Sequence, residues 1–155
     1  MKSGLCVGEL MTHKPVSIPG SVSVQDAARI MSEKSVGSLL VVEENELLGI
    51  LVRADIIREV VAYGKDASSV LVEDVMTQEV LVISPEKDVL DALRFMAEHD
   101  IRTLPVLQGE ELVGFITAKD ILKVNPELFE LLSETYVLRE EKRKLRLSPF
   151  EPENL

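Results

Sequence analysis

The sequence has no tryptophan, a single cysteine and few aromatic residues, which make up 4% of its 155 residues. With only Cys6 present, the chain cannot form an internal disulfide or a cysteine-based metal site. We expect Cys6 to enter the first structural unit as a small apolar side chain. The scarcity of aromatic rings also argues against a surface that stacks the bases of single-stranded nucleic acid.

Positive charge is also scarce: 17 basic residues stand against 27 acidic ones, for a net charge of −10. Because non-specific binding to nucleic acid or anionic lipid relies on neutralising phosphates, we expect neither partner. Long apolar runs are missing too. The main ones, residues 39–42 and 47–52, fall far below the roughly 20 residues that span a bilayer. We therefore predict a cytoplasmic protein that is not held in a membrane.

What the sequence does contain is an internal repeat, in which residues 8–57 align with residues 73–122 without a gap. The matches include Met11-Thr12 with Met76-Thr77, Gly49 with Gly114, and Asp55-Ile56 with Asp120-Ile121. So many identities in one register indicate a duplicated unit. We predict one copy over residues 7–64 and another over 72–125, followed by a helix and mobile tail within 126–155.

Each copy predicts the order β-α-β-β-α. A short strand (residues 16–18 or 81–83) precedes a helix, with Ser23 or Asp88 at its N-cap and, in the first copy, Asp26 placed as in a capping box. Two strands then form a hairpin, over 38–42 and 47–52 or over 103–107 and 112–117. A second helix begins near Arg53 or Ala118.

Apolar residues in the first helix of each copy recur at the spacing of one buried helical face. They are Val24, Ala27, Ala28 and Met31 in the first copy, and Val89, Ala92, Leu93 and Met96 in the second. A unit of this size buries too little apolar surface to be comfortably stable alone. We therefore predict an α+β fold in which the two copies pack with pseudo-two-fold symmetry, with a further helix over 127–145 and a mobile end over 148–155.

The second copy ends in a Gly114-x-x-Thr117-x-x-Asp120 motif that leads from a strand into a helix. Gly114 allows a close backbone approach, the Thr117 hydroxyl can meet a phosphate, and the Asp120 carboxylate can accept both hydroxyls of a ribose. The alternative is a plain capping box, which is far commoner. The first copy keeps Asp55 but has Val52 in place of the threonine, which favours a separate role for the carboxylate.

These paired motifs resemble the tandem CBS-domain module, or Bateman pair, over residues 7–125, and the chain looks like a stand-alone CBS pair. The resemblance implies the CBS fold and binding of AMP, ADP, ATP or S-adenosylmethionine as a regulatory ligand in clefts shared by both copies. It also implies a stronger site in which Asp120 holds the ribose, basic residues hold phosphate and the start of the first copy contacts the adenine. The residues of this site are Thr12, Lys14, Val16, Arg102, Thr103, Phe115, Ile116, Thr117, Lys119 and Asp120.

The symmetry-related site is predicted to be weak or empty, because Val52 replaces the hydroxyl there, although Arg53 offers a compensating charge. Its residues are Ser38, Ile50, Arg53, Asp55, Thr77 and Val80.

Catalysis is not expected, since the sequence shows no nucleophile paired with a base and no acid–base pair of carboxylates. His13 and His99 lack carboxylates at ligand spacing, so we also expect no metal site and no catalytic cofactor. The predicted function is that of a regulatory adenosyl-ligand sensor that forms a homodimer and passes its signal to a separate effector protein. The alternative is a ligand-free dimerisation or scaffold module that binds a partner protein.

Overall fold

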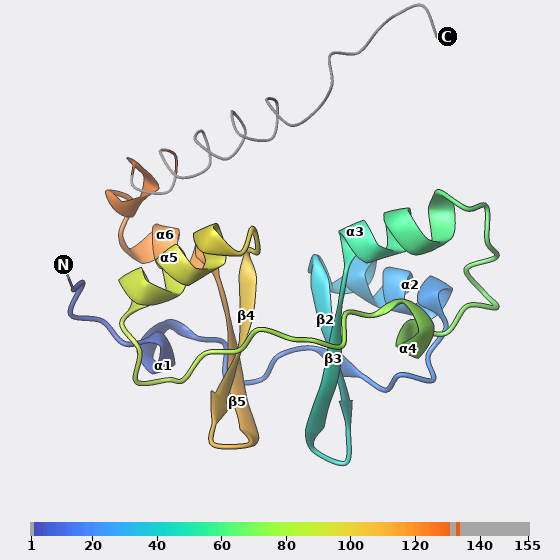
Figure 1. The fold of residues 1–155 in the computed structure, drawn as a ribbon, viewed down its shortest axis with the longest axis horizontal. Coiled ribbons are helices and arrows are strands. Elements are labelled where there is room, and N and C mark those ends of the chain that lie inside the picture. The colour runs from blue at the N-terminus through green and yellow to red at the C-terminus, as the bar shows by residue number, and fades with distance from the viewer. Residues whose placement is uncertain (1, 131–132, 134–155) are drawn as a thin grey trace, which may run out of the picture.

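Two β-hairpins stand side by side in the structure, a computed structural model that describes residues 2–130 and 133 (Figure 1). The first joins β2 (Ser38–Glu43) to β3 (Glu46–Val52), and the second joins β4 (Thr103–Gln108) to β5 (Glu111–Thr117). Both hairpins are antiparallel, as predicted, and each strand lies within one residue of its predicted bounds. The middle of β2 and of β4 is buried, because apolar side chains occupy both faces there: leucine and valine in β2, and leucine, valine and Pro105 in β4.

Each hairpin carries two helical segments of its own unit (Figure 1). They are α2 (Val24–Lys34) and α3 (Arg53–Ile56) in the first unit, and α5 (Val89–Glu98) and α6 (Ala118–Val124) in the second. A π-helical turn, η1 (Ile57–Val61), continues α3. The tandem α+β arrangement that the repeat predicts is therefore confirmed.

The predicted N-caps are also present, since Ser23 accepts a hydrogen bond from the Asp26 amide (3.1 Å) and Asp88 accepts one from the Leu90 amide (2.8 Å). The return bond of a full capping box at Asp26 is not formed. Its carboxylate instead pairs with Arg29 at 2.7 Å, an i, i+3 contact on the exposed side of the helix.

The two units exchange their opening segments. The predicted sites place Thr12 and Thr77 beside the other copy, but the crossing of the short helices before them was not predicted. The single-turn helix α1 (Val7–Leu10) precedes the first unit but lies against the second, where the Val7 amide donates to the Lys87 carbonyl (2.8 Å). The equivalent helix α4 (Val72–Val75) lies against the first unit, where the Val72 amide donates to Val22 (2.9 Å). Val7 and Val72 are both fully buried, so each hydrophobic core includes residues from both copies.

The short strands before α2 and α5 differ between the copies. In the first unit, β1 (Ser17–Ile18) pairs in parallel with β2, and the Leu40 amide donates to the Val16 carbonyl (3.2 Å). The predicted strand over 81–83 is wrong, because only Ile83 forms a bridge, with Val106. The residue equivalent to Leu40 is Pro105, which has no amide hydrogen and cannot bond the Leu81 carbonyl.

Two further expectations concern the ends of the chain. Cys6 is exposed at the start of α1, against the second unit, so its predicted place inside the first unit is wrong. The predicted helix over 127–145 reaches beyond the described residues, of which 128–130 and 133 are helical, and the predicted mobile end over 148–155 lies outside them. Within residues 2–130 and 133, no helix is both long and apolar enough to cross a bilayer.

Candidate functional site

The exchanged opening segment of the first copy crosses β5 at Gly114. Thr12 and Phe115 form a reciprocal backbone pair, with N–O distances of 2.7 and 2.9 Å. A Cβ atom added to Gly114 would lie 2.9 Å from the Thr12 carbonyl oxygen, so only glycine fits beneath this crossing. The predicted close approach at Gly114 is thus made by the chain itself, and it brings Thr12 beside the end of β5.

The same crossing occurs in the other half. Thr77 and Ile50 exchange backbone hydrogen bonds of 3.0 and 2.9 Å, and a Cβ atom on Gly49 would lie 2.8 Å from the Thr77 carbonyl. In each half, the Met-Thr pair of one copy therefore packs directly on the repeat glycine of the other copy. Each candidate site combines residues of both copies because of these crossings.

At the start of α6, Thr117 and Asp120 form a complete capping box. The Asp120 amide donates to the Thr117 hydroxyl (3.1 Å), and Asp120 Oδ2 accepts from the Thr117 amide (3.1 Å) and hydroxyl (2.7 Å). The Thr117-x-x-Asp120 motif therefore does form a capping box, as the alternative interpretation of the motif predicts. Asp120 is partly exposed, and its Oδ1 accepts no hydrogen bond from any described residue, so capping engages only one of the two carboxylate oxygens.

The equivalent Asp55 has very different surroundings, with its side chain only 3% exposed. Oδ2 accepts from the Val52 amide (2.9 Å), and Oδ1 accepts from Arg58 Nη2 (2.7 Å). Asp55 therefore has structural partners even without a capping hydroxyl, so its retention does not by itself indicate a ligand. Hydrogen bonds to Glu59 and to Asp55 raise the pKa of Arg58 above its ordinary value, so its charge persists.

Both halves place an arginine beside the start of the closing helix, but from different positions. In the first unit the Arg53 amide donates to the Gly37 carbonyl (3.2 Å), and the Arg53 guanidinium lies against Gly37. In the second unit the Ala118 amide donates to the Arg102 carbonyl (2.9 Å). Arg102 aligns with Gly37 and Ala118 with Arg53, so the same backbone hydrogen bond is present in both copies. The arginine supplies the amide donor in the first copy and the carbonyl acceptor in the second.

The remaining predicted residues do not all lie beside the starts of α3 and α6. Thr103 lies opposite Thr117 and Ser38 opposite Val52 in the hairpin registers, and Lys119 is exposed on α6. Ile116 is fully buried in the second core. Three opening-segment residues lack backbone bonds to the other unit: Val16 bonds Leu40 in its own unit, Val80 bonds Gln78, and Lys14 is exposed.

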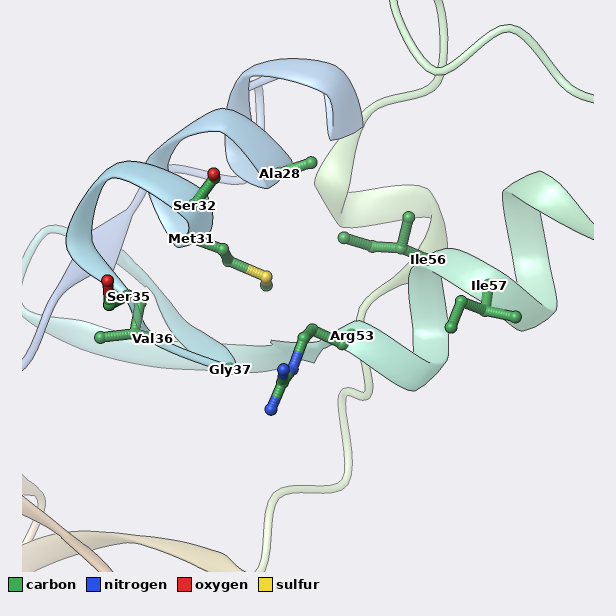
Figure 2. A pocket seen from close by; sticks show the side chains of 9 residues that line it. All are labelled: Ala28, Met31, Ser32, Ser35, Val36, Gly37, Arg53, Ile56 and Ile57. Atoms are coloured by element: carbon green, nitrogen blue, oxygen red, sulfur yellow. The ribbon is translucent and has the colours of Figure 1, made fainter.

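A pocket of about 580 Å³ opens between α2 and α3 in the first unit (Figure 2). Its lining is mostly apolar, and Arg53 is the predicted binding residue among its members. In Figure 2 the Arg53 side chain extends from the start of α3 toward Gly37, away from Ile56 and Ile57. The other lining residues are Ala28, Met31, Ser32, Ser35 and Val36.

At two of the positions that line this pocket, the residues of the second unit are more apolar, and one of them is larger. Leu93 stands where the first unit has Ala28, and Ala97 where it has Ser32. Both Leu93 and Ala97 are buried, and Leu128 packs against the same core. The pocket therefore results from small and polar residues on one face of α2. Across the part of the chain that the structure describes, no three His, Cys, Asp or Glu side chains gather as a metal-binding group.

Comparison with known proteins agrees with the observed architecture. The family model described as "CBS domain" matches the chain twice, over residues 7–62 and 72–127. An uncharacterized protein of Methanopyrus kandleri is 31% identical over 130 residues, which are 83% of this chain and 66% of that protein. The mitochondrial CBS domain-containing protein CBSX3 of Arabidopsis thaliana is 30% identical over 76% of this chain. The chain spans 63% of CBSX3, so it covers less than two thirds of either relative.

Two solved structures share the fold. An uncharacterized conserved protein from Pyrococcus horikoshii superposes with a TM-score of 0.74 at 32% identity, covering 80% of this chain and 94% of that one. The CBS-domain pair of protein MJ0100, solved in complex with 5′-methylthioadenosine and S-adenosyl-L-methionine, superposes with a TM-score of 0.69 at 25% identity. That match covers 77% of this chain and 94% of the other.

Proposed function

Because the chain belongs to the CBS-domain family and carries the domain twice, we propose that it is a regulatory module that binds an adenosine-containing ligand between its repeats. The candidate ligands are AMP, ADP, ATP and S-adenosylmethionine. A CBS pair of similar fold was solved with S-adenosylmethionine and 5′-methylthioadenosine bound, which supports an adenosyl ligand. The proposed role is regulatory and not catalytic.

The observation that carries this proposal is the second corner, residues 117–123. Here the Asp120 carboxylate is partly exposed with one oxygen not engaged by the described residues, and the Thr12–Phe115 pair brings the other copy alongside. The Arg102 backbone lies beside the start of α6, where its carbonyl accepts from the Ala118 amide, and Lys119 is exposed on the same helix. A carboxylate for a ribose and cations for phosphate or a carboxylate group suit a charged nucleoside derivative.

Thermal unfolding with each candidate ligand tests this function. A ligand that binds only the folded chain raises Tm, by an amount that grows with ligand concentration. We expect Asp120→Asn to remove most of that rise, because the variant keeps a similar shape but loses the charge. Asp55→Asn, at the equivalent buried position, is the matched control and should keep the rise. If none of the four ligands shifts Tm, or if the two variants behave alike, the proposed site is wrong.

A homodimer is the second part of the proposal, supported by apolar residues on the turn after α3. Ile57 and Val61 are 61% and 65% exposed, and Ile57 also lines the pocket beside α2. Exposed apolar side chains grouped on one surface commonly mark a protein interface. Sedimentation of Ile57→Glu should show a shift from dimer toward monomer. A scaffold without a ligand is favoured instead if the dimer forms and no candidate ligand binds.

A further inference from the structure

The two aspartates that align in the repeat differ in what occupies the space before them. Asp55 is 2% exposed as a residue, and both of its oxygens accept hydrogen bonds, one of them from Arg58. Asp120 is partly exposed, and Oδ1 is not engaged by any described residue. A ribose at Asp120 would meet an oxygen that no described residue engages, whereas at Asp55 the Arg58 guanidinium must first move away.

Arg58 is held over Asp55 by a second carboxylate. Its Nη2 donates to Asp55 Oδ1 at 2.7 Å, while its Nε donates to Glu59 Oε1 at 2.9 Å. The second unit has Lys123 and Val124 at these two positions, so it has neither the planar guanidinium nor the acidic side chain that orients it. No salt bridge joins Lys123 to Asp120 among the described residues.

We infer that Arg58 is an internal competitor that closes the first site by occupying the carboxylate that a ribose would need, with Glu59 as its positioning residue. The inference rests on the proposed function, since it requires an adenosyl ligand and an aspartate that binds it. It differs from the absence of a hydroxyl at Val52 as a cause of weak binding, because a hydroxyl at that position leaves Arg58 in place.

The size of the effect follows from the fraction of time that the ion pair is formed. If Arg58 covers Asp55 in about nine-tenths of the molecules, the apparent affinity of the first site falls about tenfold below its intrinsic value. The Arg58 side chain is 61% exposed, so water can replace the carboxylate when the pair opens. The competitor is therefore displaceable, and a high ligand concentration should still fill the first site.

Titration calorimetry with AMP, ATP and S-adenosylmethionine, each added alone to the full chain, tests the inference. The wild type should bind one ligand per chain tightly. Arg58→Met, which keeps much of the side-chain volume without charge, should bind two, with the first site strengthened about tenfold. Glu59→Gln should give a smaller gain. Lys123→Arg combined with Val124→Glu should weaken the second site, because it installs the same competitor there.

Val52→Thr is the discriminating control, since it supplies the missing hydroxyl but keeps Arg58. The inference predicts that this variant still binds one ligand per chain tightly. It is overturned, with the proposed function intact, if Val52→Thr binds two, if Arg58→Met binds as the wild type does, or if the wild type shows two equal sites. An absence of binding by every probe to the wild type and to all the variants overturns the proposed function as well.

Discussion

The first corner, residues 52–58, and the second corner, residues 117–123, belong to one duplicated motif, and in both a strand leads directly into a helix. The second uses a threonine hydroxyl to cap its helix, and one oxygen of its partly exposed aspartate accepts no hydrogen bond from the described residues. The first has no hydroxyl, and an arginine one turn later covers the aspartate. An aspartate retained in both copies therefore need not serve one purpose, because the residue three positions further along decides whether its carboxylate is already paired.

The largest expected effect comes from exchanging Leu93 on α5 and Ala28 on α2, which occupy equivalent positions in the two units. Leu93→Ala should cost about 2–5 kcal/mol of unfolding free energy, because Leu93 is fully buried and its removal leaves a cavity. The reciprocal Ala28→Leu should stabilise the chain by about 0.5–2 kcal/mol by filling the pocket beside α3. Denaturant unfolding measures both. A loss in Ala28→Leu would show that the pocket lacks room for a leucine.

The next effect concerns the glycines beneath the two crossings. Gly114→Val and Gly49→Val should each cost about 1–3 kcal/mol, since a side chain would collide with the Thr12 or Thr77 backbone. Equal losses would show that both units need the crossing. Urea unfolding with Glu111→Gln as an exposed control on β5, expected to change stability by less than about 0.5 kcal/mol, checks this. A tolerated Gly49→Val would mean that the first unit holds Thr77 less firmly.

A smaller change in stability is expected at the N-cap positions at the ends of β3 and β5, which are Val52 and Thr117. Thr117→Val should cost about 1 kcal/mol, because the hydroxyl that caps α6 is lost. Val52→Thr should gain about 0.5 kcal/mol or less, since Asp55 already has two partners and only the Asp55 amide gains a bond. Both values come from the same unfolding experiment. A gain as large as the loss would show that Arg58 contributes little to the first corner.

The smallest effect is seen only in acid and concerns the other pair of caps, Ser23 and Asp88. Partial burial raises the pKa of Asp88, but hydrogen bonds from Leu90, Ser3 and Gly4 outweigh it and lower the pKa below 3.8. Asp88 therefore adds stability above that pH, and the contribution is lost as the pH falls through the lower pKa of the folded state. The difference in Tm between wild type and Asp88→Ser should narrow below pH 3.8. A constant difference would contradict this.

Much of the fold could be predicted because the repeat presents every element twice. The hairpins, α2 and α5 follow from apolar periodicity, and the caps from Ser23 and Asp88. The exchange of α1 and α4 could not be predicted, since hydrophobic segments such as Val7 and Val72 carry no mark of which copy they will join. The missing strand at residues 81–83 depends on Pro105, which lies far away in sequence and acts only through register.

The candidate site was predictable to a similar extent. The Gly114–Asp120 motif indicates a capped helix start, which the structure confirms, and the pairing of Thr12 with Phe115 unites both copies as expected for a shared site. The Arg58–Asp55 contact could have been suspected from its i, i+3 spacing on a helix. The near-complete burial of Asp55 could not, because it depends on how the whole first corner packs.

The exchanged opening segments affect the order in which the chain can fold during its synthesis. The core of the first unit requires residues near Val72, which leave the ribosome only after β3 is complete, while α1 must wait for the whole second unit. Contacts between such distant parts of a sequence slow folding. They also join the two halves into one cooperative unit, so that a cut in the connecting segment would not release either half as an independent domain.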